Sequence, residues 1–230
     1  LYTSACITQL SNILVDVVLE QLRRRFELGF DGTAREHWDF GSSWRHENRD
    51  GNKSFGAVIG NNGGNPRAVL IPEPIDYSSD DFDAVMSFRD QKKQFSLAYH
   101  ASLFDNNQGS FGWENPYTPI NGWTPVVVGF PNGEGQAGGP PENQFHQVSA
   151  AGGWNFSGSM RLDGDLAYGR MSQDDDYLPY TINPALAATI TQPLPRGSLD
   201  ARIDTTLGNL RLSGRPTDRL RWNAGLRYDD

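Results

Sequence analysis

Cysteine and long hydrophobic runs are both scarce in this chain. Its 230 residues include one cysteine, Cys6, so no intrachain disulfide can form and no haem-attachment motif with paired cysteines can be written. The longest apolar stretches, such as residues 126–130 and 185–188, fall far short of the roughly 18 residues that a membrane-spanning helix needs. A transmembrane β-barrel is not excluded, because its strands alternate in polarity and look hydrophilic on average.

Basic charge and metal-ligand patterns are scarce as well. With 28 acidic and 20 basic side chains the net charge is −8, and no extended basic block argues for a nucleic-acid partner. The four histidines and the acidic clusters at residues 80–83 and 174–176 lack the spacing of a metal site or a calcium loop. Asp163 and Asp165 could suggest a glycosidase pair, but the neighbouring Arg161 argues against it. We therefore predict no catalytic, cofactor or metal site, and a protein that is not an enzyme.

The first 25 residues differ from the rest, because they contain no glycine or proline. Their apolar residues recur at helical spacing before the basic run at residues 23–25. These apolar residues are Ile7, Leu10, Leu14, Val17, Val18 and Leu22. We predict an amphipathic helix over residues 1–25, a leader segment of uncertain origin, with a boundary near Phe26. Since the chain begins at Leu1 without a signal-peptide pattern, we expect a processed or truncated chain.

From Phe26 onward the hydrophobic period is two, which is typical of strands with one wet face. The alternating segments are residues 37–45, 81–89, 94–103, 143–170, 199–212 and 220–228, with short turns at 90–93, 157–158 and 214–217. One apolar face is predicted to carry Phe82, Met86, Phe88, Phe95, Leu97, Tyr99, Leu220, Trp222 and Leu226. A phase slip near Gly208, which we interpret as a β-bulge, would bring Leu210 and Leu212 onto that face.

Three long connections alternate with these short turns. Residues 48–80, 105–142 and 171–198 are rich in Gly, Pro, Asn and Asp, whereas soluble domains mostly use connections of about four to six residues. Strands of about ten residues, short turns at one end and long loops at the other are typical of outer-membrane barrels. We predict an all-β, antiparallel, up-and-down transmembrane β-barrel over residues 26–230, present in part as seven to eight long strands.

The polar strand faces carry opposed charges and would line the lumen if the apolar face meets lipid. The candidate partner-facing residues are Arg161, Asp163, Asp165, Asp200, Arg202, Asp204, Arg219, Arg221 and Arg227. They could contact a partner by complementary charge, or simply pair with one another across the strands of a polar wall. At the strand ends we expect an interfacial aromatic girdle of Trp38, Trp44, Trp154, Trp222 and Tyr228.

Several stretches resemble one known family, the MtrB/PioB type of decahaem-associated outer-membrane β-barrels. They are residues 37–41 running into 44–51, the segment 63–77, and residues 177–180, 198–200, 204–206 and 215–221. The resemblance covers about residues 26–230, and residues 1–25 match nothing in it. The family's barrels have more strands than are readable in this sequence, so the chain resembles a middle piece of one.

The resemblance implies a role in the bacterial outer membrane. Barrels of this family wrap a periplasmic decahaem c-type cytochrome, and an extracellular multihaem cytochrome often docks on their long loops. It implies that outer-membrane lipid surrounds the wall, that haem is carried by the partner cytochrome, and that this chain itself holds no cofactor. Two alternatives stay open, a diffusion porin and a soluble carbohydrate-binding β-sandwich at the cell surface.

Overall fold

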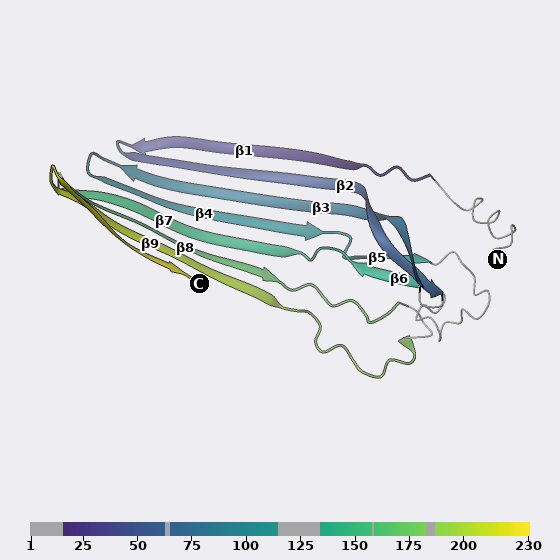
Figure 1. The fold of residues 1–230 in the computed structure, drawn as a ribbon. Helices are drawn as coiled ribbons and strands as arrows, with labels where there is room; N and C mark the ends of the chain where they lie inside the picture. Colours follow the sequence, from purple (N-terminus) through teal and green to yellow (C-terminus); the bar gives the residue numbers. More distant parts are fainter. Residues whose placement is uncertain (1–15, 63–64, 115–133, 158, 183–186) are drawn as a thin grey trace.

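The computed structural model describes residues 16–62, 65–114, 134–157, 159–182 and 187–230, and most of them form β-strands (Figure 1). The large sheet contains β1 (Gln21–Arg35), β2 (Trp38–Asn62), β3 (Asn65–Arg89), β4 (Lys93–Asn106), β7 (Asn143–Ser157), β8 (Met160–Gln173), β9 (Ala201–Thr217) and β10 (Leu220–Asp229). A separate two-stranded sheet pairs β5 (Ser110–Glu114) with β6 (Glu134–Gly138). No helix among these residues has the length and apolar character needed to cross a membrane.

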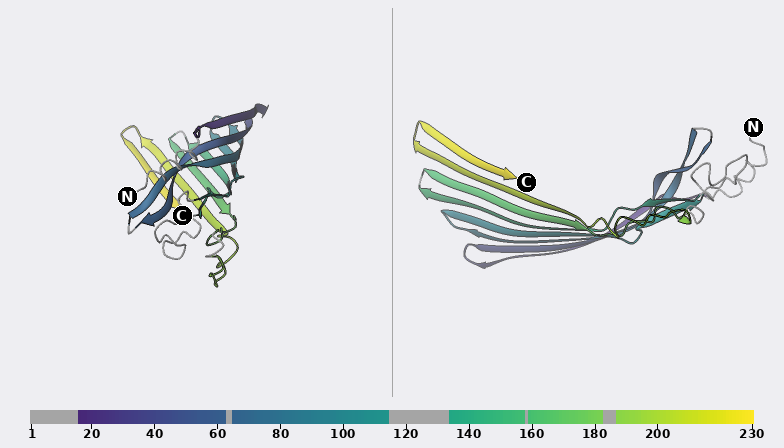
Figure 2. Two further views of the ribbon diagram at one scale, coloured as in Figure 1. Left: turned by 90° about the vertical axis from the view of Figure 1, so that its right-hand side faces the viewer. Right: turned by 90° about the horizontal axis from the view of Figure 1, so that it is seen from below.

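The large sheet is a continuous antiparallel meander, because its spatial order β1-β2-β3-β4-β7-β8-β9-β10 is the order along the chain. The short connections β1–β2, β3–β4, β7–β8 and β9–β10 lie at one end of the sheet. The longer connections that follow β4 and β8 lie at the other end, together with the far end of the β2–β3 hairpin, while β1 and β10 form opposite edges of an open, curved sheet (Figures 1 and 2). The predicted antiparallel up-and-down architecture is confirmed.

Strand register separates the sheet into two chemically different faces. Leu97 pairs with Met86 on one side and Ala150 on the other, whereas Ser96 pairs with Ser87 and Ala151. We call the face with Leu97 the apolar face and the face with Ser96 the polar face. The predicted apolar set lies on the apolar face, with Leu220 next to a register shift at the start of β10.

The large sheet is a single layer, and none of the elements that the structure describes covers its apolar face. Leu97, Leu166 and Leu226 are 40%, 57% and 70% exposed, and the fully buried apolar residues of the described chain are Ala57, Ile75 and Ala101. Soluble proteins rarely expose a contiguous apolar surface of this kind. The sheet therefore requires an apolar environment on this side.

The predicted N-terminal helix is wrong for the residues that the structure describes. Residues 16–20 have no regular structure and β1 pairs antiparallel with β2 from Gln21 onward, so the expected boundary near Phe26 falls inside a strand. The physical reason is that Leu22, Phe26 and Leu28 also fit a period of two, and pairing with β2 stabilises the strand. Residues 1–15 lie outside the described residues.

The segment 48–80 is not a loop, because β2 and β3 continue as one long paired hairpin to Asn62 and Asn65. This extension projects past β1, whose pairing with β2 starts at Gln21 (Figure 2). Phe55 on the extension packs edge-on against Phe111 of β5, with ring centroids 5.0 Å apart. Thus β5 and β6, which lie inside the predicted connection 105–142, help to order this end of the sheet.

The predicted turn at residues 214–217 and the predicted bulge at Gly208 also need correction. Residues 214–217 belong to β9, and the turn falls at residues 218–219 instead. No register shift occurs at Gly208, because β9 pairs with β8 in one register from Ala201 to Gly214. The predicted bulge at Gly208 is therefore wrong. Residue 158 of the β7–β8 turn lies outside the described residues.

Candidate functional site

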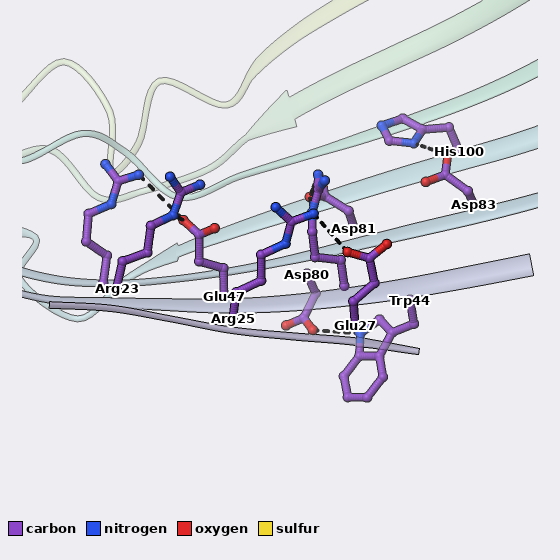
Figure 3. Close-up of polar contacts among 11 residues, drawn as sticks. Arg23, Arg25, Glu27, Trp44, Glu47, Asp80, Asp81, Asp83 and His100 are labelled. Carbon is purple, nitrogen blue, oxygen red and sulfur yellow. Dashed lines mark hydrogen bonds and ion pairs between the residues drawn. The ribbon is translucent and has the colours of Figure 1, made fainter. Parts of the chain in front are cut away.

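A row of charged side chains crosses the polar face from β1 to β4 (Figure 3). Arg23 and Arg49 stand opposite each other in the β1–β2 register and would repel. The Glu47 carboxylate offsets this repulsion, because its Oε1 lies 2.6 Å from Arg23 Nε and 3.5 Å from Arg49 Nη2. Because the Glu47 side chain is only 11% exposed, this carboxylate depends on both guanidinium groups.

The row continues toward β4 with the same internal pairing. Arg45 forms an ion pair with Asp81, and its Nε donates to Asp81 Oδ2 at 2.9 Å. His100 Nδ1 lies 2.8 Å from Asp83 Oδ1. Trp44, next to Arg45, points to the opposite side of the sheet (Figure 3). The carboxylates of Glu47 and Asp81 are thus paired with guanidinium groups within the wall, and these guanidinium groups remain partly exposed to whatever fills the polar side.

The predicted charges of β8 lie on the same polar face. Arg161 Nη2 is 2.7 Å from Asp163 Oδ1, and Asn209 Nδ2 donates to Asp165 Oδ2 at 2.8 Å. Asp163, Asp165 and Asn209 line a hollow of about 520 Å³ together with the small residue Ala151. The Arg161–Asp163 ion pair lies within β8, whereas the hydrogen bond from Asn209 to Asp165 crosses from β9 to β8. The hollow nevertheless leaves room for an approaching partner surface.

The β10 residues are only partly brought into this wall. Arg227 lies on the polar face, with Nε 3.5 Å from Asp229 Oδ1. Arg221 lines a second hollow together with Arg211, and Arg219 belongs to the turn between β9 and β10. Arg219 is therefore separated from the wall, contrary to its predicted position.

Three predicted lumen residues do not lie on the polar face. Asp200 precedes β9, has a positive φ of 48° and receives no position in the sheet. Arg202 and Asp204 share the apolar face with Leu210, since β9 has no slip at Gly208. A bulge reverses the faces of the residues on one side of it relative to those on the other side. The bulge predicted at Gly208 therefore put Arg202 and Asp204 on the wrong face.

The charged row on β1 to β3 was missed by sequence reasoning. Arg23 was assigned to a helix and Glu47 was placed at the edge of a predicted loop, so neither was considered as part of a wall. The alternation of Arg25 and Glu27 with Phe26 and Leu28 was the available signal. Within the described residues, no three His, Cys, Asp or Glu side chains come together as a metal site.

Beyond the end of β1, the β2–β3 extension has its own ion pair. Lys53 Nζ lies 2.9 Å from Glu73 Oε1, and Glu73 is 6% exposed. The hydrogen bond to Glu73 raises the pKa of Lys53, because it favours the charged ammonium group. This pair ties the two strands of the extension together where β1 no longer supports them.

Comparison with known proteins places this geometry in context. A family model described as "outer membrane beta-barrel porin, MtrB/PioB" matches residues 2–230, so the match includes most of the segment that sequence reasoning left unassigned. The curated "Outer membrane protein MtrB" of Shewanella baltica (strain OS185) is 26% identical over 221 residues. That alignment covers 96% of this chain and 29% of the relative, so the chain spans less than a third of that protein's length.

Solved structures of an outer-membrane protein also resemble the fold. The outer-membrane expressed OmpT of Vibrio cholerae matches with a TM-score of 0.42 and 13% identity, covering 90% of this chain and 46% of that one. The in-vitro folded form of OmpT gives a TM-score of 0.37 with 10% identity, covering 89% of this chain and 53% of that one.

Proposed function

Because the chain belongs to the MtrB/PioB family of outer-membrane β-barrel porins and lies in the outer membrane, we propose that its sheet is part of a wall enclosing a periplasmic decahaem c-type cytochrome. The wall would insulate the haem chain and so support electron transfer across the membrane. The proposal assigns haem to the cytochrome and no catalytic step to this chain. An extracellular multihaem cytochrome is the proposed second partner, at the end with the long connections.

The observation that supports this proposal best is the contrast between the two faces. The apolar face suits lipid, while the polar face carries charges of both signs, several of them paired with one another, as in the Glu47 group. A wall of this kind offers hydrogen bonds and complementary charge to an enclosed protein without a strong field of one sign. The hollow beside Asp163 gives room for a convex partner surface.

A diffusion porin is the second candidate, because the same charged row would also suit a water-filled lumen. The soluble β-sandwich is wrong, since the family is an outer-membrane one and the apolar face is uncovered. Sheath and porin differ in what fills the lumen, and not in the wall itself.

The test uses the full-length protein in liposomes that enclose an electron acceptor. With a reductant outside, we expect acceptor reduction only when the barrel and its cytochrome are both present. Reduction by the barrel alone would contradict the sheath. Rapid passage of small solutes through the isolated barrel, with no haem protein recovered from native membranes, would favour the porin.

A further inference from the structure

The apolar face changes character at the end of the sheet that carries the long connections. Along β8 this face presents Met160, Leu162, Leu166 and Tyr168, and then Arg170. Ten residues at about 3.3 Å each, tilted by about 40°, correspond to roughly 25 Å of membrane thickness, which is the height of an outer-membrane barrel's apolar band. Arg170 therefore lies at one edge of the lipid-facing band.

Two charged residues of β9, one acidic and one basic, lie beside Arg170. Asp204 is its partner in the β8–β9 register, and Arg202 follows two residues away on the same face. Asp204 accepts hydrogen bonds from Arg170 Nε at 2.7 Å, from Arg202 Nε at 2.6 Å and from the Tyr168 hydroxyl at 2.7 Å. Arg170 Nη2 also donates to the Tyr168 hydroxyl at 2.8 Å.

This cluster has one positive charge more than it can neutralise internally. Two guanidinium groups share the single carboxylate of Asp204, and their side chains are 45% and 57% exposed. Arg202 contacts Asp204 through Nε, so its two terminal nitrogens remain available as donors toward the surroundings. A planar guanidinium with free terminal nitrogens matches phosphate oxygens in pairs.

The side of the membrane follows from the connections. Outer-membrane barrels have short turns on the periplasmic side and long connections outside, and β8 and β9 are joined at this edge by the long connection that follows Gln173. The cluster therefore faces the outer leaflet, at the level where lipid chains meet phosphorylated headgroups. A positive charge next to hydrocarbon has little water to screen it, so an anionic group in reach stabilises it.

We propose that Arg170 and Arg202, held in place by Asp204 and Tyr168, bind a phosphate group of an outer-leaflet lipid. The lipid chemistry that fits is a phosphorylated glycolipid of the lipid A type, whose acyl chains would lie along Leu162 and Leu166. This site is separate from the polar face, so it does not depend on what the lumen contains.

The test is native mass spectrometry of the full-length protein purified with its partner in mild detergent and titrated with bisphosphorylated lipid A. We expect the R170Q/R202Q double variant to bind this lipid at least about tenfold more weakly, because two charge-assisted contacts are lost. The matched control is R211Q/R227Q, which removes the same charge from the polar face of β9 and β10 and should bind normally. Heat-dependent electrophoretic mobility checks that each variant is folded.

Changing the lipid provides a test that needs no variant. The unaltered protein should bind lipid A from which both phosphates have been removed at least about tenfold more weakly than the bisphosphorylated form. The R170K/R202K variant keeps both charges and should bind with intermediate affinity. Equal binding of the two lipids, or equal loss in the polar-face control, would overturn the proposal. Displacement of lipid A by inorganic phosphate at comparable concentration would overturn the assignment to a lipid.

Discussion

The assignment of the two faces can be tested within a single strand, β9. Leu210 lies on the apolar face and Leu207 on the polar face, although both are leucines of similar exposure, 49% and 43%. We predict that Leu210→Arg destabilises the barrel in lipid vesicles far more than Leu207→Arg does. The two variants carry the same chemical change, so their difference isolates the environment of each face.

The magnitude follows from the position of Leu210 near the centre of the apolar band. An arginine that faces lipid near the bilayer midplane costs about 2–4 kcal/mol, whereas a substitution on the polar side should change stability by about 0.5 kcal/mol or less. We therefore expect the free energies of unfolding of the two variants to differ by about 2–3 kcal/mol.

The assay is urea titration of the full-length barrel, without its partner, folded into phosphatidylcholine vesicles. A bulge at Gly208 would place Leu207 and Leu210 on the same face, and both variants would then be destabilised equally. Equal destabilisation would refute the continuous register of β9. A larger loss for Leu207→Arg would refute the assignment of the apolar face to lipid.

Three further predictions concern local contacts. Glu47→Gln should lower the unfolding free energy by about 1 kcal/mol in the same titration, because two guanidinium groups lose their carboxylate, whereas Glu27→Gln, in an exposed pair, should cost less than about 0.5 kcal/mol. Asn106→Ala should cost about 1–3 kcal/mol and speed proteolysis after β4, since buried Asn106 bonds the Pro140 carbonyl at 2.8 Å. Two backbone amides of its turn lower the pKa of Asp90, so its stabilising effect is present above the ordinary carboxyl pKa and lost as pH falls through the folded-state pKa. The free energy of unfolding of Asp90→Asn should therefore be lower than that of the wild type at pH 7, and the two values should converge in acid.

The sequence was a sufficient guide to the fold wherever one face of a strand is continuously apolar. The alternation around Leu97 and Ser96 determines the strand type, its register and its orientation together, because a one-residue slip would expose the whole apolar set. The same reasoning predicted the meander and the short turn near residues 90–93. It could also place Arg161, Asp163 and Asp165 on the polar face.

The errors arise where the chain leaves the apolar band. Beyond the lipid-facing region the apolar face becomes polar, so Arg202 and Asp204 were assigned to the lumen and a bulge at Gly208 was needed to reconcile the pattern. At β1, Leu22, Phe26 and Leu28 fit both a helix and a strand, and only the partner strand decides between them. The long β2–β3 extension was hidden because its glycines and prolines are typical of loops.

The central claim is that the polar face of this wall surrounds a haem protein, and cross-linking tests it most directly. Gln147 lies on the polar face and the adjacent Val148 on the apolar face of β7. The photo-reactive residue p-benzoylphenylalanine would be placed at each position of the full-length protein in native membranes, and adducts would be stained for covalently bound haem. We predict a haem-containing adduct from position 147 and none from position 148. A haem-containing adduct from position 148, or none from position 147, would contradict the account.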